Sequence, residues 1–201
     1  MLVGCVIYYE DCLDLLERCF TSLRARVDRL VAVDGAYESF PHDLPWSSEA
    51  HLQVAKRYAD VLWSTGVPWA DEIEKRNSYL EHCDPGDWVL VLDADEELHG
   101  RLPVLDEAQV GYNVTLHQDW LQPRPVFRFF RMSEGLHYRG AHNALFDAEG
   151  RLLNHEVTET LPNLNIEHHA WKRPAERVSA KGIYVRALAE RERAFREEYK
   201  L

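Results

Sequence analysis

Apolar and polar positions alternate in blocks along the first hundred residues, and each block has the length of a strand or a helix. Residues 2–8 and 88–92 are short, almost unbroken apolar runs rich in β-branched side chains, which is typical of strands covered on both faces. Residues 11–27 instead carry apolar side chains at helical spacing. That stripe comprises Cys12, Leu15, Leu16, Cys19, Phe20, Leu23 and Val27.

The other elements of this half continue the alternation. Strands are expected at residues 29–34 and 60–63, and helices at residues 48–58 and 70–83. Such alternation predicts an α/β fold with a mostly parallel central sheet and helices on both faces. Ligands of such sheets bind beyond the carboxyl ends of the strands. Asp34 and Asp93, which end two strands, are therefore expected to face one crevice.

The pattern changes after residue 100, where strand-like segments follow one another with little helix between them. Strands are expected at residues 111–116, 126–132 and 164–168, a loop at 118–125, a hairpin at 145–153 and a charge-rich helix at 174–199. This half is therefore expected to be mixed and partly antiparallel. The length of 201 residues favours a single domain.

Charge and cysteine content narrow the class of protein. The formal net charge of −11 is unfavourable for non-specific binding to nucleic acid. The four cysteines lack CxxC spacing, so we interpret them as reduced, mostly buried thiols. No apolar run has the length of a signal peptide or of a membrane span, which favours a cytoplasmic protein.

The clearest chemical motif is the acidic run that follows the strand at residues 88–92. Asp93 and Asp95 lie two residues apart, so both carboxylates can turn toward one ion once the chain leaves the sheet. Hard divalent cations prefer such oxygen ligands together with phosphate oxygens. The alternative is a solvated acidic turn. Glu96 and Glu97 are expected to face solvent or to cap the next segment.

Further motifs accompany this acidic run. They are Val33-Asp34-Gly35, Glu74-Lys75-Arg76-Asn77, Arg128-Phe129-Phe130-Arg131, Tyr138-Arg139-Gly140-Ala141-His142 and Ile166-Glu167-His168-His169. In this combination the chain resembles the family 2 glycosyltransferases, in particular their small bacterial and phage-type branch. The resemblance implies a GT-A fold and an inverting transferase that moves a sugar from a nucleotide-diphosphate-sugar donor to an acceptor hydroxyl. Within a single domain 1–201, it implies a nucleotide-sugar-binding half at 1–99, an acceptor-side half at 100–173 and a C-terminal helix at 174–201.

The resemblance also implies roles for individual residues. The donor would be bound by Tyr8, Glu10, Asp34, Arg76, Asn77 and Asp93. In this scheme Asp34 contacts the base or ribose, and Asp93 contacts the ribose, or the metal through water.

The same resemblance implies a divalent metal site. Asp95 would bind Mn²⁺ or Mg²⁺ directly, and His168 or His169 would complete the shell; a surface or structural histidine pair is the alternative. The cation would stabilise the negative charge of the departing nucleoside diphosphate.

Inversion also requires a group that takes the proton of the acceptor hydroxyl. His142 is the first candidate, followed by Glu134 and Asp119. Relatives in this branch often have His-Glu where this chain has His142-Asn143. A role in shaping the acceptor pocket is therefore the alternative for His142.

Two further groups of side chains allow more than one interpretation. The first group consists of Arg124, Arg128, Arg131 and Arg139. These arginines either contact a diphosphate or an anionic acceptor, or form a solvated strand face. The second group consists of Trp46, Trp69 and Trp120. They are expected in loops beside the crevice, where they would stack on a sugar or a base.

Two other classes of function are open on the sequence alone. A nucleotidyltransferase on a similar sheet would place a glycine-rich loop with a basic residue after the first strand, whereas residues 8–11 are Tyr-Tyr-Glu-Asp. A sugar-nucleotide-binding module without catalysis fits Asn143, while the intact Asp93 and Asp95 disfavour it. A UDP-sugar is the expected donor because UDP is the commonest choice in the family. The acceptor is open among a glycan, a lipid-linked sugar, a protein and a modified DNA base.

Overall fold

The computed structural model describes residues 1–40, 42–118, 121–140, 144–157, 159–169, 193 and 197. The strands of its main sheet are β1 (Leu2–Tyr8), β2 (Arg29–Asp34), β3 (Val61–Trp63), β4 (Trp88–Asp93), β5 (Glu96–Gly100), β6 (Gly111–Gln118), β7 (Leu121–Arg131) and β10 (Thr160–His168). They are hydrogen-bonded in the order β3-β2-β1-β4-β7-β6-β10-β5. A separate ribbon pairs β8 (His137–Tyr138) with β9 (Leu145–Phe146).

The first four strands in this order are parallel, as the sequence predicts. Their register brings the carboxyl ends level, because Tyr8 pairs with Asp34 and Ile7 pairs with Asp93. The ends of β1, β2 and β4 therefore lie at one edge of the sheet, which brings Asp34 and Asp93 to the same edge as predicted.

The second half of the sheet is mixed, which confirms the prediction for this part of the chain. β7 is antiparallel to both β4 and β6, β10 is parallel to β6, and β5 is antiparallel to β10. A continuous sheet thus crosses from the first hundred residues into the second.

This half of the sheet must curl, because only Ala94 and Asp95 separate β4 from β5 along the chain. In the hydrogen-bonded order β5 lies four strand steps from β4, which in a flat sheet would be about 19 Å. Three residue steps from Asp93 to Glu96 span at most about 11 Å. The sheet therefore bends round on itself, so that β5 begins directly after β4 in sequence and pairs with β10 at the other end of the strand order.

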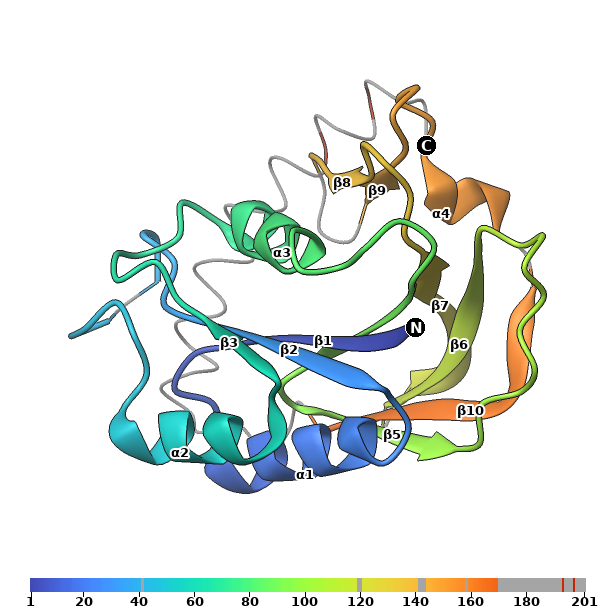
Figure 1. The fold of residues 1–201 in the computed structure, drawn as a ribbon. Coiled ribbons are helices and arrows are strands. Elements are labelled where there is room, and N and C mark those ends of the chain that lie inside the picture. The colour runs from blue at the N-terminus through green and yellow to red at the C-terminus, as the bar shows by residue number, and fades with distance from the viewer. Residues whose placement is uncertain are drawn as a thin grey trace.

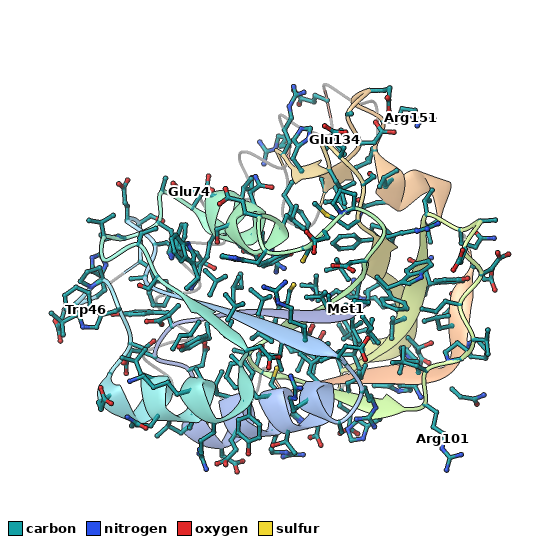
Figure 2. All side chains as sticks on the ribbon, in the orientation of Figure 1. Met1, Trp46, Glu74, Arg101, Glu134 and Arg151 are labelled. Atoms are coloured by element: carbon teal, nitrogen blue, oxygen red, sulfur yellow. The ribbon has the colours of Figure 1, made fainter. Side chains whose placement is uncertain are left out.

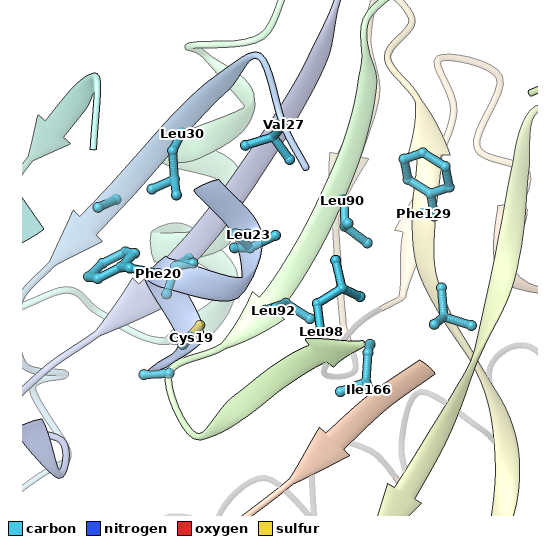
Figure 3. Packing of buried hydrophobic residues seen from close by; sticks show 14 of the residues in the cluster. Cys19, Phe20, Leu23, Val27, Leu30, Leu90, Leu92, Leu98, Phe129 and Ile166 are labelled. Atoms are coloured by element: carbon cyan, nitrogen blue, oxygen red, sulfur yellow. The ribbon is translucent and has the colours of Figure 1, made fainter. Parts of the chain in front are cut away.

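Helices cover both faces of the parallel part, as predicted. α1 (Leu13–Arg24) and α2 (Glu49–Tyr58) lie on one face, and α3 (Glu72–Leu80) lies on the other (Figure 1). Figure 3 shows Cys19, Phe20 and Leu23 of α1 among side chains of β2, β4, β5 and β10. Burial of this apolar stripe is the main source of stability for such a helix.

One segment of this half differs from its predicted structure, and a second forms its predicted hairpin and then continues into a short helix. The loop predicted at residues 118–125 is wrong, since β7 begins at Leu121 and pairs with Gln118. Pro123 and Pro125 suggested a loop. Within the described residues β4 pairs with β7 only at residues 129–131, so one side of the proline-containing stretch has no strand partner there and tolerates proline. In the segment predicted as a hairpin, β9 makes a bridge from Phe146 to Leu152 and then α4 (Leu153–Glu156) follows.

The helix predicted at residues 174–199 lies outside the described residues except for positions 193 and 197. None of the helices in the described ranges has the length and apolarity needed to cross a bilayer.

Candidate functional site

Helix α3 is held firmly at the carboxyl ends of the parallel strands. Its first turn is capped by Asp71, whose Oδ1 accepts hydrogen bonds from the backbone N–H groups of Ile73 and Glu74, both at 2.9 Å. One turn later, the buried Lys75 donates to the backbone oxygens of Tyr8 and Gly35, both at 2.6 Å. These bonds fix α3 across the ends of β1 and β2, and so determine where the next residue, Arg76, points.

Asp93 at the end of β4 is held between two arginines from different elements. Arg76 Nη2 lies 2.7 Å from its Oδ1, and Arg128 Nη2 of β7 lies 2.8 Å from its Oδ2. Arg76 also pairs with Glu72 one turn earlier on α3. Asp93 is 24% exposed, whereas both arginines are buried. The carboxylate is thus fixed in orientation with part of its surface still accessible.

Glu96 is part of the same network, and the expectation that it faces solvent is wrong. It is 1% exposed, accepts from Arg128 at 2.9 Å and accepts from the backbone N–H of Asp93 at 2.8 Å. Burial raises the pKa of Glu96, and the charge of Arg128 offsets part of that shift. The acidic pattern suggested a solvated turn because the neutralising arginine lies 32 residues away on another strand.

Asp95 and His168 lie side by side where β10 ends against the turn between β4 and β5. His168 Nε2 is 3.1 Å from Asp95 Oδ2, although the residues are 73 positions apart in sequence. Asp95 is buried, and its backbone oxygen accepts from His169 N at 2.9 Å. Burial alone would lower the pKa of His168, but the hydrogen bond and negative charge of Asp95 outweigh it, so the pKa is raised.

Asp34 lies deeper, at the end of β2, and is fully buried. Its two oxygens accept from the hydroxyl and the backbone N–H of Ser47, at 2.5 and 2.9 Å. Burial raises the pKa of Asp34, and the bonds from Ser47 offset part of the shift. In this arrangement the carboxylate anchors the loop before α2 through Ser47, which is itself fully buried.

Three other predicted donor residues lie close to these strand ends. The hydroxyl of Tyr8 is buried and has no hydrogen-bond partner within the described ranges, and burial raises its pKa. Glu10 has a left-handed backbone with φ of 43° and accepts from the backbone N–H of Ser48. Asn77 exchanges hydrogen bonds with the backbone of Tyr138, at 2.7 and 3.0 Å, and so ties α3 to β8.

Of the three candidate catalytic bases, the structure describes only Glu134. His142 and Asp119 lie outside the described residues, as does Trp120. Glu134 is exposed on the turn before β8, where Figure 2 labels it, and it makes none of the contacts of the Asp93 network. The three candidates stay predictions.

Of the tryptophans and arginines named in the sequence analysis, some are buried and others are exposed. Trp69 is buried and donates from Nε1 to the backbone oxygen of Asp34 at 2.8 Å, so the expectation that it lines the crevice is wrong. Trp46 is exposed, as Figure 2 shows. Among the arginines, Arg128 enters the acidic network, while Arg124 and Arg139 are exposed.

The sequence interpretation missed two buried charges of this site, Glu72 and Lys75. Both lie in the first turns of α3 near Arg76, and the motif resemblance gives neither of them a role. A signal did exist for Glu72, because it is four residues before Arg76, the spacing of an ion pair along a helix. Lys75 donates to the backbone oxygens of Tyr8 and Gly35, and no side-chain pattern in the sequence reveals backbone partners of this kind.

Comparisons with known proteins do not assign the chain to a family, and no protein-family model matches it. A TPR repeat-containing protein of Synechococcus elongatus is 33% identical over 95 residues, which are 47% of this chain and 20% of that protein. The chain therefore spans about a fifth of that relative's length. A crystal structure of S. aureus TarS 1-349 superimposes with a TM-score of 0.40 and 13% identity, covering 62% of this chain and 38% of that one.

Proposed function

We propose that this chain is a metal-dependent, inverting glycosyltransferase that moves a sugar from a nucleotide-diphosphate-sugar donor to an acceptor hydroxyl. The observation that carries the proposal is the contact between Asp95 and His168. A carboxylate that follows a buried parallel strand meets an imidazole from a distant strand, at the edge where such sheets bind ligands. The motif resemblance, which includes both residues, supports the same chemistry.

The residues of this pair fit a hard divalent cation. Asp95 Oδ2 and His168 Nε2 are 3.1 Å apart, close to the edge of about 3.0 Å expected between adjacent ligands of an octahedral ion with bonds of about 2.1 Å. Asp95 and His168 would hold Mn²⁺ or Mg²⁺, and His169 would not share this shell. When bound, the ion would stabilise the negative charge that develops on the departing nucleoside diphosphate.

The two buried arginines would hold the groups that contact the donor in place before the donor binds. Arg76 and Arg128 fix the carboxylate of Asp93, whose exposed part would accept a ribose hydroxyl. Arg76 Nη1 has no hydrogen-bond partner among the residues that the structure describes, so one buried donor stays available for an anion. Because these side chains are already ordered, donor binding would require little further loss of side-chain entropy.

The base of the nucleotide would lie toward the ends of β1 and β2. Tyr8, Glu10 and Asp34 lie at or just after these strand ends, and Ser47 links Glu10 to Asp34 by hydrogen bonds. We assign Asn77 to positioning, since its amide holds β8 in place. A UDP-sugar is the first donor to test. His142 is our first candidate for the base that takes the acceptor proton, ahead of Glu134 and Asp119.

The proposal is tested by hydrolysis of UDP-sugars in the absence of an acceptor, with Mn²⁺ or with EDTA. Asp95→Asn keeps the shape of the side chain and is expected to abolish metal-dependent release of UDP. Asp14→Asn, at an exposed position of α1, is the matched control and should leave release unchanged. Release that is equal in Asp95→Asn and wild type, or equal in EDTA and Mn²⁺, would contradict the proposed role.

A further inference from the structure

A second group of metal-binding side chains lies at the outer edge of the curled sheet. Glu97 and His99 are on β5, Glu167 is on β10, and His169 directly follows β10. Glu97 pairs directly with Glu167 in the antiparallel ladder, and alternate side chains of a strand share a face. Glu97, His99 and Glu167 therefore project from one face of the β5–β10 pair, which Figure 1 shows at the end of the sheet.

The distances in this group suit a shared cation better than direct hydrogen bonds. His99 Nε2 is 3.4 Å from Glu167 Oε2 and 3.7 Å from Glu97 Oε1, and the ligand atoms of the three residues all lie within 4.8 Å of one another. Nitrogen–oxygen hydrogen bonds are usually 2.7–3.2 Å long. Two ligands of a tetrahedral ion with bonds of about 2.05 Å are about 3.3 Å apart, and the His99–Glu167 separation of 3.4 Å is close to this value.

His169 points into the same group and is the least exposed of its histidines. It is 9% exposed, and its Nε2 has no hydrogen-bond partner in the described part of the chain. That atom lies 3.5 Å from Glu97 Oε2 and 3.8 Å from Glu167 Oε2. A buried ring nitrogen without a hydrogen bond is unfavourable unless a ligand satisfies it.

The negative charge of this group is only partly neutralised by the positive charges described around it. Arg18 of α1 pairs with Glu97 Oε2, so that Oε1, which faces His99, is the oxygen available to a metal. Glu167 is exposed and contributes the second carboxylate. Two carboxylates carry a formal charge of −2, and among the residues that the structure describes Arg18 is the arginine that offsets half of it.

We propose that Glu97, His99, Glu167 and His169 form a second metal site, which binds a transition-metal dication such as Zn²⁺. Two imidazoles with two carboxylates are ligands that favour Zn²⁺ over Mg²⁺. This site is separate from Asp95 and His168, because His168 contacts Asp95 whereas His169 faces Glu97 and Glu167. It does not depend on the proposed transferase activity.

The position of the site indicates a structural role. The ion would join β5 to β10, and β5 begins directly after Asp95. Binding here would therefore hold the short turn that carries Asp93 and Asp95, while leaving those carboxylates for other ligands. Metal bound only to the folded chain stabilises it by mass action.

The test is titration of Zn²⁺ alone into tag-free protein, read by competition with a chromophoric chelator. The background is Asp95→Asn/His168→Ala, which removes the other candidate metal ligands and is expected to bind one Zn²⁺ per chain. Adding His99→Ala should weaken binding at least about tenfold, since even loss of a ligand's outer hydrogen-bond partner weakens metal affinity 10–100-fold. Adding His137→Ala, on β8, is the matched control and should leave affinity unchanged.

Two further measurements keep the test decisive if a variant folds poorly. Glu167→Gln changes an exposed side chain with little change in shape, and it should also weaken Zn²⁺ binding. Co²⁺ in place of Zn²⁺ should give the strong visible absorption of a four-coordinate ion, and His99→Ala should remove it. The proposal would be overturned if neither His99→Ala nor Glu167→Gln changed the affinity for Zn²⁺. It would also be overturned if the Asp95→Asn/His168→Ala protein bound no Zn²⁺ while its melting curve showed that it was folded.

Discussion

The buried pair of Arg128 and Glu96 offers the sharpest prediction about what holds this site together. Arg128→Met keeps most of the apolar stem but removes the cation that lies 2.9 Å from Glu96. Glu96 is 1% exposed, so it cannot exchange this partner for water. Removing one partner of a buried ion pair typically costs 3–5 kcal/mol. We expect a loss at the lower end, about 3 kcal/mol, because Glu96 keeps its hydrogen bond from the backbone N–H of Asp93.

The assay is urea denaturation at pH 7, followed by tryptophan fluorescence and circular dichroism. Arg124→Met is the matched control, since it makes the same change at an exposed position of the same strand. It should alter the free energy of unfolding by less than about 0.5 kcal/mol.

A double-mutant cycle separates the ion pair from the packing of the arginine stem. Glu96→Gln removes the charge that Arg128 neutralises, so the double variant should be less damaging than the sum of the two single variants, by about 1–3 kcal/mol. Strict additivity would mean that the two side chains do not interact energetically. Additivity, or a loss below about 1 kcal/mol in Arg128→Met alone, would refute the reasoning.

Three further predictions concern the elements around the site. Asp71→Ala removes the cap of α3 and should lower the free energy of unfolding by about 1 kcal/mol in urea denaturation, whereas no change would mean that the cap is not needed. Gly100→Ala should strongly destabilise the chain, because φ is 94° and an added Cβ would lie 1.8 Å from the backbone oxygen of Asn163; a melting temperature equal to wild type would contradict this. Burial raises the pKa of Asp34, so its carboxyl group holds a proton more tightly in the folded state than in the unfolded state. Wild type should therefore lose stability as the pH rises from the unfolded pKa to the raised pKa of the folded state. The unfolding free energy of Asp34→Asn minus that of wild type should therefore increase as the pH rises above the ordinary Asp value of 3.8, and it should level off once the pH exceeds the raised pKa; a flat difference would exclude the shift.

The sequence predicted the parallel half of the fold well because its signals are local. An unbroken apolar run or an apolar stripe at helical spacing reports the burial of that segment itself, and β1, β2, β4 and α1 all lie where these patterns place them. β5 was missed, because its acidic first residues have the composition of a solvated turn. Its burial depends on how the sheet curls, and that is decided by pairings between segments far apart in sequence.

In the candidate site too, some features follow from local sequence signals and others depend on contacts between distant segments. The strand ends at Asp34 and Asp93 follow from periodicity, whereas the partners of these carboxylates do not. Arg128 is 35 residues from Asp93, and only the curl of the sheet brings them together. The choice between His168 and His169 also depends on which face each side chain occupies at the end of β10. Alternation predicts that the two differ, and only the fold decides which one meets Asp95.

The central claim is a metal-dependent site for a nucleoside diphosphate, and calorimetric titration of UDP and then GDP tests it most directly. Each nucleotide is titrated with Mn²⁺ present and again with EDTA, into wild type, Asp95→Asn and His99→Ala. The account predicts binding of one nucleotide that requires Mn²⁺, disappears in Asp95→Asn and persists in His99→Ala. Binding of the same strength in EDTA, or in Asp95→Asn, would contradict it, as would failure of all common nucleoside diphosphates to bind with Mn²⁺ present.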